Sequence, residues 1–402
     1  MSLTLLLDLD DTLLVNNMDT FIPAYLGAWS RLVADFVDPK KFVDALLGGT
    51  RQMTRNRRPD CTLQDVFEAF FFPALQVDEA QFREIAERFY AQVFPTLRGL
   101  TRPRPEAVAL VEQALARGYS LAIATNPLFP LTAIQQRLEW AGLPVERYPY
   151  QWVPSYESSH FAKPDPAYFS EMLGYLGWPD GPVVMVGDDL ELDIHSAHKA
   201  GIPTFWLERQ AANPAKGEEE LSTVGALGDL LPWLDRAPVE DLTPDYSSPS
   251  AMLSTLRATP AVLDGLCRNI PPQLWVQRPE SGEWCLTELV CHLRDVDQEV
   301  NLPRIQKVLA ENNPFVPGRD TDPWAEERKY IQQDGRQALS QFVVQRMKLV
   351  DTLDALQPGD WQRTARHAIF GPTPLSELVD IIARHDRLHI RQVKEVIRTV
   401  VK

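Results

Sequence analysis

The chain has 402 residues, of which 45% are hydrophobic, and its 55 acidic and 40 basic residues give a formal net charge of −15. At about 150 residues per domain, this length predicts two or three domains, each able to bury its own core. The negative charge repels polyanions, so we expect neither nucleic acid nor an anionic membrane as a partner.

The start of the chain and its cysteines bear on the compartment. The sequence MSLTLLLDLDD runs from a few apolar residues directly into carboxylates without a basic leader, which is typical of a buried strand and not of a signal peptide. No later segment approaches the roughly 18 uncharged apolar residues of a membrane-spanning helix. The four cysteines form no CxxC pair, so we expect reduced thiols. We therefore predict a soluble, cytoplasmic protein.

Four short apolar runs predict the strands of a parallel sheet. They lie at residues 3–7, 121–124, 183–186 and 204–207. Continuous apolar runs are typical of strands that are covered on both faces. Helical patterns such as 106–117 alternate with these runs, which predicts βαβ units and an α/β doubly wound parallel sheet.

The remaining apolar residues recur at helical spacing. The segments at 21–36, 63–75 and 82–94 predict a helical cap inserted after the first strand. Segments at 251–269, 286–312, 337–355 and 375–401 predict an all-α four-helix bundle, in which we expect no strand. The predicted organisation is an α/β domain at 1–235 with a core at 1–15 and 100–235 and a cap at about 16–99, a linker at 236–250, and the bundle at 251–402.

Polar side chains follow three of the predicted strands. They are Asp8 and Asp10, then Thr125 and Asn126, then Asp188 and Asp193, with Lys163 in the sequence FAKPDP. Because the carboxyl ends of parallel strands meet at one edge of a sheet, we expect these groups to converge. Carboxylates crowded in this way repel one another, and a hard divalent cation with oxygen ligands relieves the repulsion. Mg²⁺ is the cation that fits best.

These residues resemble the haloacid dehalogenase (HAD) superfamily. Its motifs stand here in the family's order as DLDDTL (8–13), AIATN (122–126), AKPDP (162–166) and VGDDLELD (186–193), over about the first 235 residues. The resemblance implies a HAD-like Rossmannoid fold and a Mg²⁺-dependent phosphatase. The dehalogenase members replace the second aspartate of the first motif, so the retained Asp10 favours phosphoryl transfer. Four motifs in order disfavour the alternative that DxD is only a solvated turn.

The same resemblance implies roles for individual residues. Asp8 would attack phosphorus, and Asp10 would protonate the leaving oxygen and later activate water. Thr125, Asn126 and Lys163 would hold the phosphoryl group, and Asp8, Asp10, Asp188 and Asp193 would hold Mg²⁺.

The predicted cap bears on the substrate. It resembles the cap of the HAD subfamily that closes over small soluble substrates, which implies a small phosphorylated metabolite. Within it, Arg51 and Arg55 belong to the basic stretch TRQMTRNRRPD and would bind a carboxylate or second phosphate of the substrate. The alternative is that this stretch is a solvated basic turn.

Three histidines predict a second metal site. His385 and His389 are four residues apart on one helical face, and His292 on a separate helix supplies the third ligand. Three imidazoles leave positions open for water or substrate, which is typical of a catalytic site. The expected ion is a divalent transition metal, namely Zn, Ni or Fe.

These histidines resemble those of the DinB-like family of four-helix-bundle metalloenzymes over about residues 250–402. Trp284 stands shortly before His292, and the sequence at 367–371 fits HxxFG. Some relatives transfer low-molecular-weight thiols or isomerise thiol adducts, and many have no assigned activity, so the resemblance implies a metal site better than it implies a reaction. A thiol-dependent transferase with such a thiol as partner is the reaction that we expect from these relatives. HDRLH is also similar to the HExxH helix of zinc peptidases, but Asp386 replaces the glutamate and is one methylene shorter.

The leading hypothesis is a bifunctional or regulated enzyme, with a capped HAD phosphatase fused to a metal-binding bundle. In a second hypothesis the bundle is a sensor or dimerisation module, whose histidines hold a ligand or metal that modulates the phosphatase. As a dimerisation module, it would make the protein a homodimer. A third hypothesis is a scaffold with a relic active site, and the four interdependent groups Asp8, Asp10, Lys163 and Asp188 argue against it.

Overall fold

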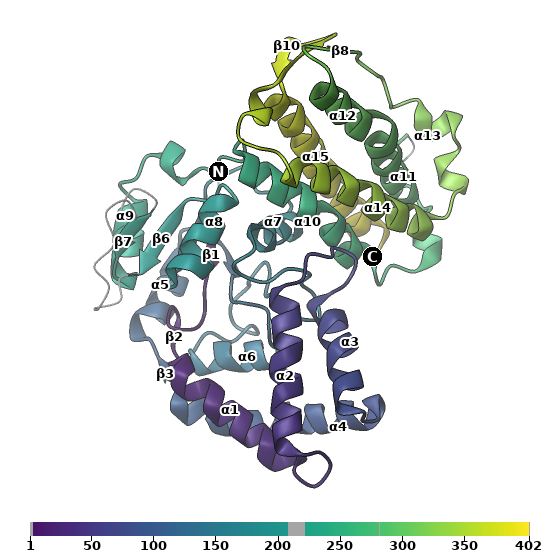
Figure 1. Ribbon diagram of the computed structural model, residues 1–402. Helices are drawn as coiled ribbons and strands as arrows, with labels where there is room; N and C mark the ends of the chain where they lie inside the picture. Colours follow the sequence, from purple (N-terminus) through teal and green to yellow (C-terminus); the bar gives the residue numbers. More distant parts are fainter. Residues whose placement is uncertain (1–2, 208–221, 281, 402) are drawn as a thin grey trace. The chain divides into compact units, whose positions relative to one another are not determined.

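The computed structural model describes residues 3–207, 222–280 and 282–401 (Figure 1). By its internal contacts the chain divides into two compact units, one of Met1–Tyr168 with Pro179–Pro244 and one of Phe169–Trp178 with Asp245–Lys402. The segment predicted as a linker, 236–250, supplies packing residues to each unit. Leu242 is buried in the core of the first unit, and the Tyr246 ring contacts the Trp178 ring within the second.

A parallel sheet forms the centre of the first unit. The described residues place five strands in it, in the order β4-β1-β5-β6-β7. Their bounds are Thr4–Leu7 (β1), Ser120–Ile123 (β4), Val183–Gly187 (β5), Thr204–Leu207 (β6) and Thr223–Gly225 (β7). The first four confirm the strands predicted from the apolar runs. The partly exposed β7 was not predicted, because three half-buried residues carry no apolar run.

A short antiparallel ribbon connects this core to the helical cap. Its strands are β2 (Leu14–Val15) and β3 (Arg102–Pro103), on either side of the insertion. The cap helices are α1 (Met18–Val33), α2 (Pro39–Thr54), α3 (Leu63–Leu75) and α4 (Glu79–Arg88). The helices that follow the cap in sequence are α5 (Pro105–Ala116), α6 (Leu131–Trp140), α7 (Pro166–Leu176), α8 (Ser196–Lys199) and α9 (Leu230–Leu234). The predicted insertion is therefore present, with one helix, α2, that the sequence pattern did not predict.

Two glycines bring α2 and α3 close together, side by side in Figure 1. A Cβ at Gly48 would overlap the Phe70 ring, and one at Gly49 would overlap the Phe67 ring. Glycine costs about 1 kcal/mol in a helix interior relative to alanine, so its presence at both positions reflects this close approach.

The second unit is mainly helical. Besides most of α7, its helices are α10 (Pro249–Cys267), α11 (Leu286–Val296), α12 (Leu302–Ala310), α13 (Trp324–Glu327), α14 (Gly335–Asp354) and α15 (Leu375–Val400). The predicted helix at 286–312 is present as α11 and α12, which are joined by a π-helical turn at Asp297–Asn301. Buried aliphatic side chains from α10, α14 and α15 pack in one core, as the four amphipathic patterns predict.

The prediction that this region has no strand was wrong. The strands β8 (Phe315–Val316), β9 (Thr364–His367) and β10 (Gly371–Pro374) form a sheet in the order β10-β9-β8. Strands of two to four residues are too short for a period of two to be read from sequence. Pro372 and Pro374 also argue against a strand, but β10 lies at the edge, where proline is tolerated.

A buried ion cluster ties three elements of the second unit together. Arg346 of α14 is fully buried, with its Nε 2.7 Å from Asp297 Oδ2 and its Nη2 3.0 Å from Asp386 Oδ1. Thr259 donates a hydrogen bond of 2.8 Å to the Asp386 carboxylate, and Asn301 donates one of 2.8 Å to the Asp297 carboxylate. Each carboxylate therefore contacts the Arg346 guanidinium and accepts a further hydrogen bond, as buried ions require.

Replacing Arg346 by methionine should destabilise the second unit by about 3–5 kcal/mol, because two buried carboxylates would lose their cation. Urea unfolding followed by helical circular dichroism measures this as a lower midpoint for one transition. The matched control is Arg398→Met on α15, where the arginine is exposed and pairs with Glu395 of the same helix. Equal midpoints for the two variants would contradict the importance of the cluster.

Candidate active site and metal centre

Strand register brings the predicted catalytic residues to one edge of the sheet. Leu7 at the end of β1 pairs with Ile123 of β4 on one side and with Val186 of β5 on the other. The residues that follow these strands therefore meet around one pocket of about 300 Å³. It is lined by Asp8, Asp10, Asp11, Met18, Ile22, Thr125, Asn126, Leu128, Phe129, Arg137, Lys163, Asp188, Asp189, Leu192 and Asp193. The structure thus brings together all of the site residues predicted for the core.

Lys163 is the buried cation of this site. Its Nζ lies 3.0 Å from Asp8 Oδ1 and 2.5 Å from Asp193 Oδ1, and its side chain is 1% exposed. Asn126 positions the lysine, since its Oδ1 accepts a 3.2 Å hydrogen bond from the Lys163 backbone N–H. Burial lowers the pKa of Lys163, but Asp193 and Asp8 outweigh burial and raise that pKa above its usual value.

The loop after β5 wraps around the Asp193 carboxylate. Its Oδ2 accepts hydrogen bonds of 3.1 Å from the backbone N–H groups of both Asp188 and Asp189. Gly187 makes this possible, because a Cβ there would overlap the Asp193 carboxylate. A glycine at this position is thus part of the site.

Three carboxylates are arranged as a cation site. Oxygen atoms of Asp8, Asp188 and Asp193 lie within 4.8 Å of one another. Burial raises the pKa of the Asp8 carboxyl well above its ordinary value, and Asp193 and Asp188 raise it further, so Lys163 compensates the negative charge only in part. The donor set, oxygen atoms with excess negative charge, fits Mg²⁺.

Asp10, which was also predicted as a Mg²⁺ ligand, has its carboxylate engaged elsewhere. Asn16 donates a 2.7 Å hydrogen bond to Asp10 Oδ1, and the Arg137 guanidinium forms an ion pair with Oδ2. Arg137 is 1% exposed, and its guanidinium carbon lies 4.7 Å from the centre of the Phe129 ring. The Arg137 side chain therefore contacts both Asp10, the predicted acid/base, and the Phe129 ring.

The sequence patterns did not identify Arg137. A signal was nevertheless available, because Arg137 lies three and four residues after Ile134 and Ala133, on the apolar face of α6. A charged residue on the buried face of a helix requires a partner.

The structure does not bring the predicted cap arginines to this pocket. Arg51 and Arg55 are exposed, and neither is among the described residues that line it. Within the same basic stretch, Arg57 Nη1 lies 2.5 Å from the Asp165 carboxylate in the segment that carries Lys163. The role of Arg51 and Arg55 in substrate binding stays a prediction.

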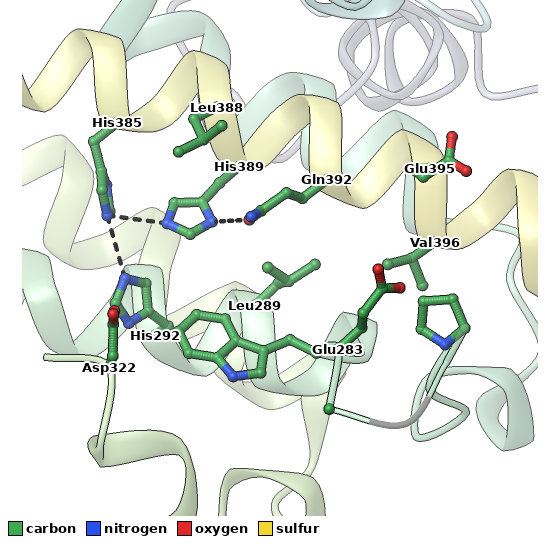
Figure 2. A pocket seen from close by; sticks show the side chains of 13 residues that line it. Glu283, Leu289, His292, Asp322, His385, Leu388, His389, Gln392, Glu395 and Val396 are labelled. Carbon is green, nitrogen blue, oxygen red and sulfur yellow. Dashed lines mark hydrogen bonds between the residues drawn. The ribbon is translucent and has the colours of Figure 1, made fainter.

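In the second unit, the three predicted histidines converge (Figure 2). His385 Nε2 lies 3.2 Å from His292 Nε2 and 3.0 Å from His389 Nε2. The Trp284 ring packs 4.8 Å from the His292 ring. His385 and His389 come from α15 and His292 from α11, as the helical spacing predicts.

Gln392 orients one of these rings, as Figure 2 shows. Its Oε1 lies 2.6 Å from His389 Nδ1, so a proton on Nδ1 leaves the lone pair of Nε2 directed at the other two rings. Burial lowers the pKa of His292 to about 3 and the pKa values of His385 and His389 to about 4. The rings are therefore neutral at neutral pH, the form that binds metal.

A cavity of about 610 Å³ opens on the histidine triad. Besides the three rings, its wall includes Glu283, Leu388, Asp322 and Gln392. Three nitrogen ligands beside an open cavity suit a metal ion that keeps a position for an exchangeable ligand.

Fold and site together define an α/β domain with a parallel sheet, an inserted helical cap and a cluster of buried carboxylates around Lys163 at one edge of the sheet. The chain belongs to the haloacid dehalogenase-like hydrolase family, whose sequence model matches residues 3–201. Residues 255–393 match the DinB superfamily. No helix among the described residues combines the length and apolarity that crossing a membrane requires.

Two phosphatases are similar to parts of the chain. The phosphoserine phosphatase of Thermus thermophilus is 32% identical over 127 residues, which are 32% of this chain and 47% of that protein. The chain therefore spans about half the length of this relative. The pyrimidine 5'-nucleotidase PynA of Streptococcus pneumoniae is 32% identical over 182 residues, which are 44% of this chain and 70% of that protein. Among solved structures, YfiT from Bacillus subtilis is 20% identical to this chain, with a TM-score of 0.35. YfiT is described as "a probable metal-dependent hydrolase with an unusual four-helix bundle topology", and the match covers 40% of this chain and 91% of that chain.

The low pKa values of the triad predict a pH dependence for the metal-free protein. An unfolded histidine takes up a proton below about pH 6.5, whereas these buried rings stay neutral until the pH approaches about 4. After metal removal, the stability of the second unit should fall as the pH is lowered from about 6.5 to about 4. Urea midpoints across this range should fall less steeply in His292→Gln than in the unchanged protein. The matched control, His198→Gln, replaces an exposed histidine on α8 and should keep the steep fall.

Proposed function

We propose that the first unit hydrolyses phosphate monoesters of small metabolites with Mg²⁺ as its cofactor. The observation that carries the proposal is the Asp8 carboxylate, held by Lys163 at the end of β1 beside Asp188 and Asp193. The names of both relatives describe hydrolysis of phosphate monoesters, which supports this class of reaction.

Asp8 and Asp10 divide the chemistry between them. A carboxylate oxygen of Asp8 attacks phosphorus to form an aspartyl-phosphate, while the bond from phosphorus to the leaving oxygen breaks and Asp10 gives that oxygen a proton. Water then attacks phosphorus and loses a proton to Asp10, so that inorganic phosphate leaves and both carboxyl groups return to their first state. The ion pair with Arg137 and the hydrogen bond from Asn16 fix the Asp10 carboxylate for both proton transfers.

The remaining residues hold the phosphoryl group and balance its charge. Thr125 and Asn126 would bind phosphoryl oxygens at the end of β4, and Lys163 would offset the charge on nucleophile and phosphate. When bound by Asp8, Asp188 and Asp193, Mg²⁺ supplies positive charge that stabilises the phosphoryl oxygens. We assign the Asp10 side chain the acid/base role alone.

We further infer that the second unit binds a divalent transition metal, Zn, Ni or Fe, through His292, His385 and His389. The adjacent cavity favours a site that admits a substrate over a closed structural site with four ligands. A low-molecular-weight thiol as that substrate, a homodimer and a cytoplasmic location stay predictions from the sequence.

Asp8→Asn should abolish Mg²⁺-dependent phosphate release from a panel of small phosphate esters, with a loss on the order of a thousandfold or more, because an amide is not a nucleophile for phosphorus. Phosphate release is measured with and without Mg²⁺. The control Asp35→Asn changes an exposed aspartate of the cap sequence and should retain activity. Activity that survives in Asp8→Asn would refute the assigned nucleophile.

His292→Ala should remove the metal of the second unit, because two imidazoles hold a divalent ion far less tightly than three. Elemental analysis of the dialysed full-length protein should give about one transition-metal ion per chain before the change and close to none after it. His198→Ala, at an exposed position outside the triad, is the control and should retain the metal. Unchanged metal content in His292→Ala would show that the triad is not the site.

A further inference from the structure

The cap encloses an apolar cavity that none of the residues discussed for catalysis explains. It has a volume of about 260 Å³ and lies among the cap helices and the segment that follows β4. Aromatic side chains dominate its wall, among them Trp29, Phe42, Phe67, Phe71 and Phe82. None of the described residues that line it carries a charge.

The polar groups on this wall are few. Three hydroxyls are paired with protein groups, whereas the buried Trp29 indole N–H has no hydrogen-bond partner among the described residues. The hydroxyls of Tyr25 and Tyr90 lie 2.9 Å apart and hydrogen-bond to each other. The Thr50 hydroxyl donates a 2.9 Å hydrogen bond to the Leu46 carbonyl in its own helix. A charged group of a ligand would lose its hydration here and would meet no ion of opposite charge among the described residues that line the cavity.

This cavity adjoins the pocket around Asp8. Ile22, Leu128 and Phe129 line both. A phosphoryl group bound at Asp8 would therefore lie beside the apolar cavity, with these three side chains shared between the two. The Arg137 guanidinium lies over the Phe129 ring and lines the pocket around Asp8.

We propose that the apolar cavity binds the leaving group, so that the preferred substrate is the phosphate monoester of an apolar alcohol, with an alkyl or aryl group beyond the ester oxygen. This inference rests on the proposed phosphatase function and names its substrate class. Burial of each methylene group contributes about 0.8 kcal/mol, which corresponds to about a fourfold change in binding.

A series of n-alkyl monophosphates from ethyl to hexyl tests the proposal on the full-length protein. These esters differ little in leaving-group basicity, so chain length isolates binding in the cavity from leaving-group reactivity. KM should fall about fourfold per added methylene until the cavity is filled, with kcat nearly constant. O-phosphoserine and glycerol phosphate, whose leaving groups are polar, should have KM values at least tenfold above that of the hexyl ester. A KM independent of chain length would overturn the proposal.

Two alanines of α4 provide a matched pair of variants. Ala86 lines the cavity, whereas Ala80 on the same helix is exposed. Ala86→Phe should fill the cavity and remove the dependence of KM on chain length, while the KM of methyl phosphate stays unchanged. Ala80→Phe should behave as the unchanged protein. An undiminished chain-length dependence in folded Ala86→Phe would overturn the location, and if that variant does not fold, the series on the unchanged protein decides.

Binding of n-alkylphosphonates, which cannot be hydrolysed, separates the cavity from the chemistry. Calorimetry should show affinity rising with chain length. That result, together with a lack of hydrolysis of every ester, would support the cavity and refute the phosphatase. Hydrolysis with no chain-length dependence in KM or in phosphonate affinity would refute the cavity and leave the phosphatase standing.

Discussion

The chemistry of the first unit depends on three carboxylates, Asp8, Asp188 and Asp193, that repel one another at one edge of the sheet. Parallel register places them there, since β1 lies between β4 and β5 and every strand ends at the same edge. Lys163 neutralises this cluster only in part. Burial raises the pKa of Asp8, and Asp193 and Asp188 raise it further. A bound cation would offset the negative charge, so the geometry that surrounds Asp8 with carboxylates also favours a metal ion.

In the second unit, protein groups stabilise the buried carboxylates. Arg346 lies between Asp297 and Asp386, and these carboxylates also accept hydrogen bonds from Asn301 and Thr259. Asp386 neighbours His385 in sequence, so the cluster anchors the turn of α15 that carries the first histidine of the pair. Since α11 runs directly into the π turn that contains Asp297, the same cluster anchors the end of the element bearing His292. A satisfied ion cluster thereby fixes the two helices that must present their imidazoles to each other.

Sequence predicted the parts of this protein that depend on local pattern. Buried parallel strands are continuous apolar runs, and the functional groups directly follow them, so both the strands and the converging residues could be predicted. Features that depend on contacts between distant segments could not. The helix α2 holds Gly48 and Gly49 because α3 packs against it, yet glycines in sequence argue against a helix. Arg137 pairs with Asp10, which is 127 residues away in the sequence. The strands of the second unit were missed because each is short and one contains two prolines.

The two sites offer different donor atoms, and this difference separates the metals that they would hold. The first presents carboxylate oxygens, which suit Mg²⁺, and the second presents imidazole nitrogens, which suit transition metals. Protons do not compete for the nitrogens near neutral pH, because burial keeps the pKa values of His385 and His389 near 4. A transition metal would therefore favour the histidine site and Mg²⁺ the carboxylates, so that the two sites would hold different ions.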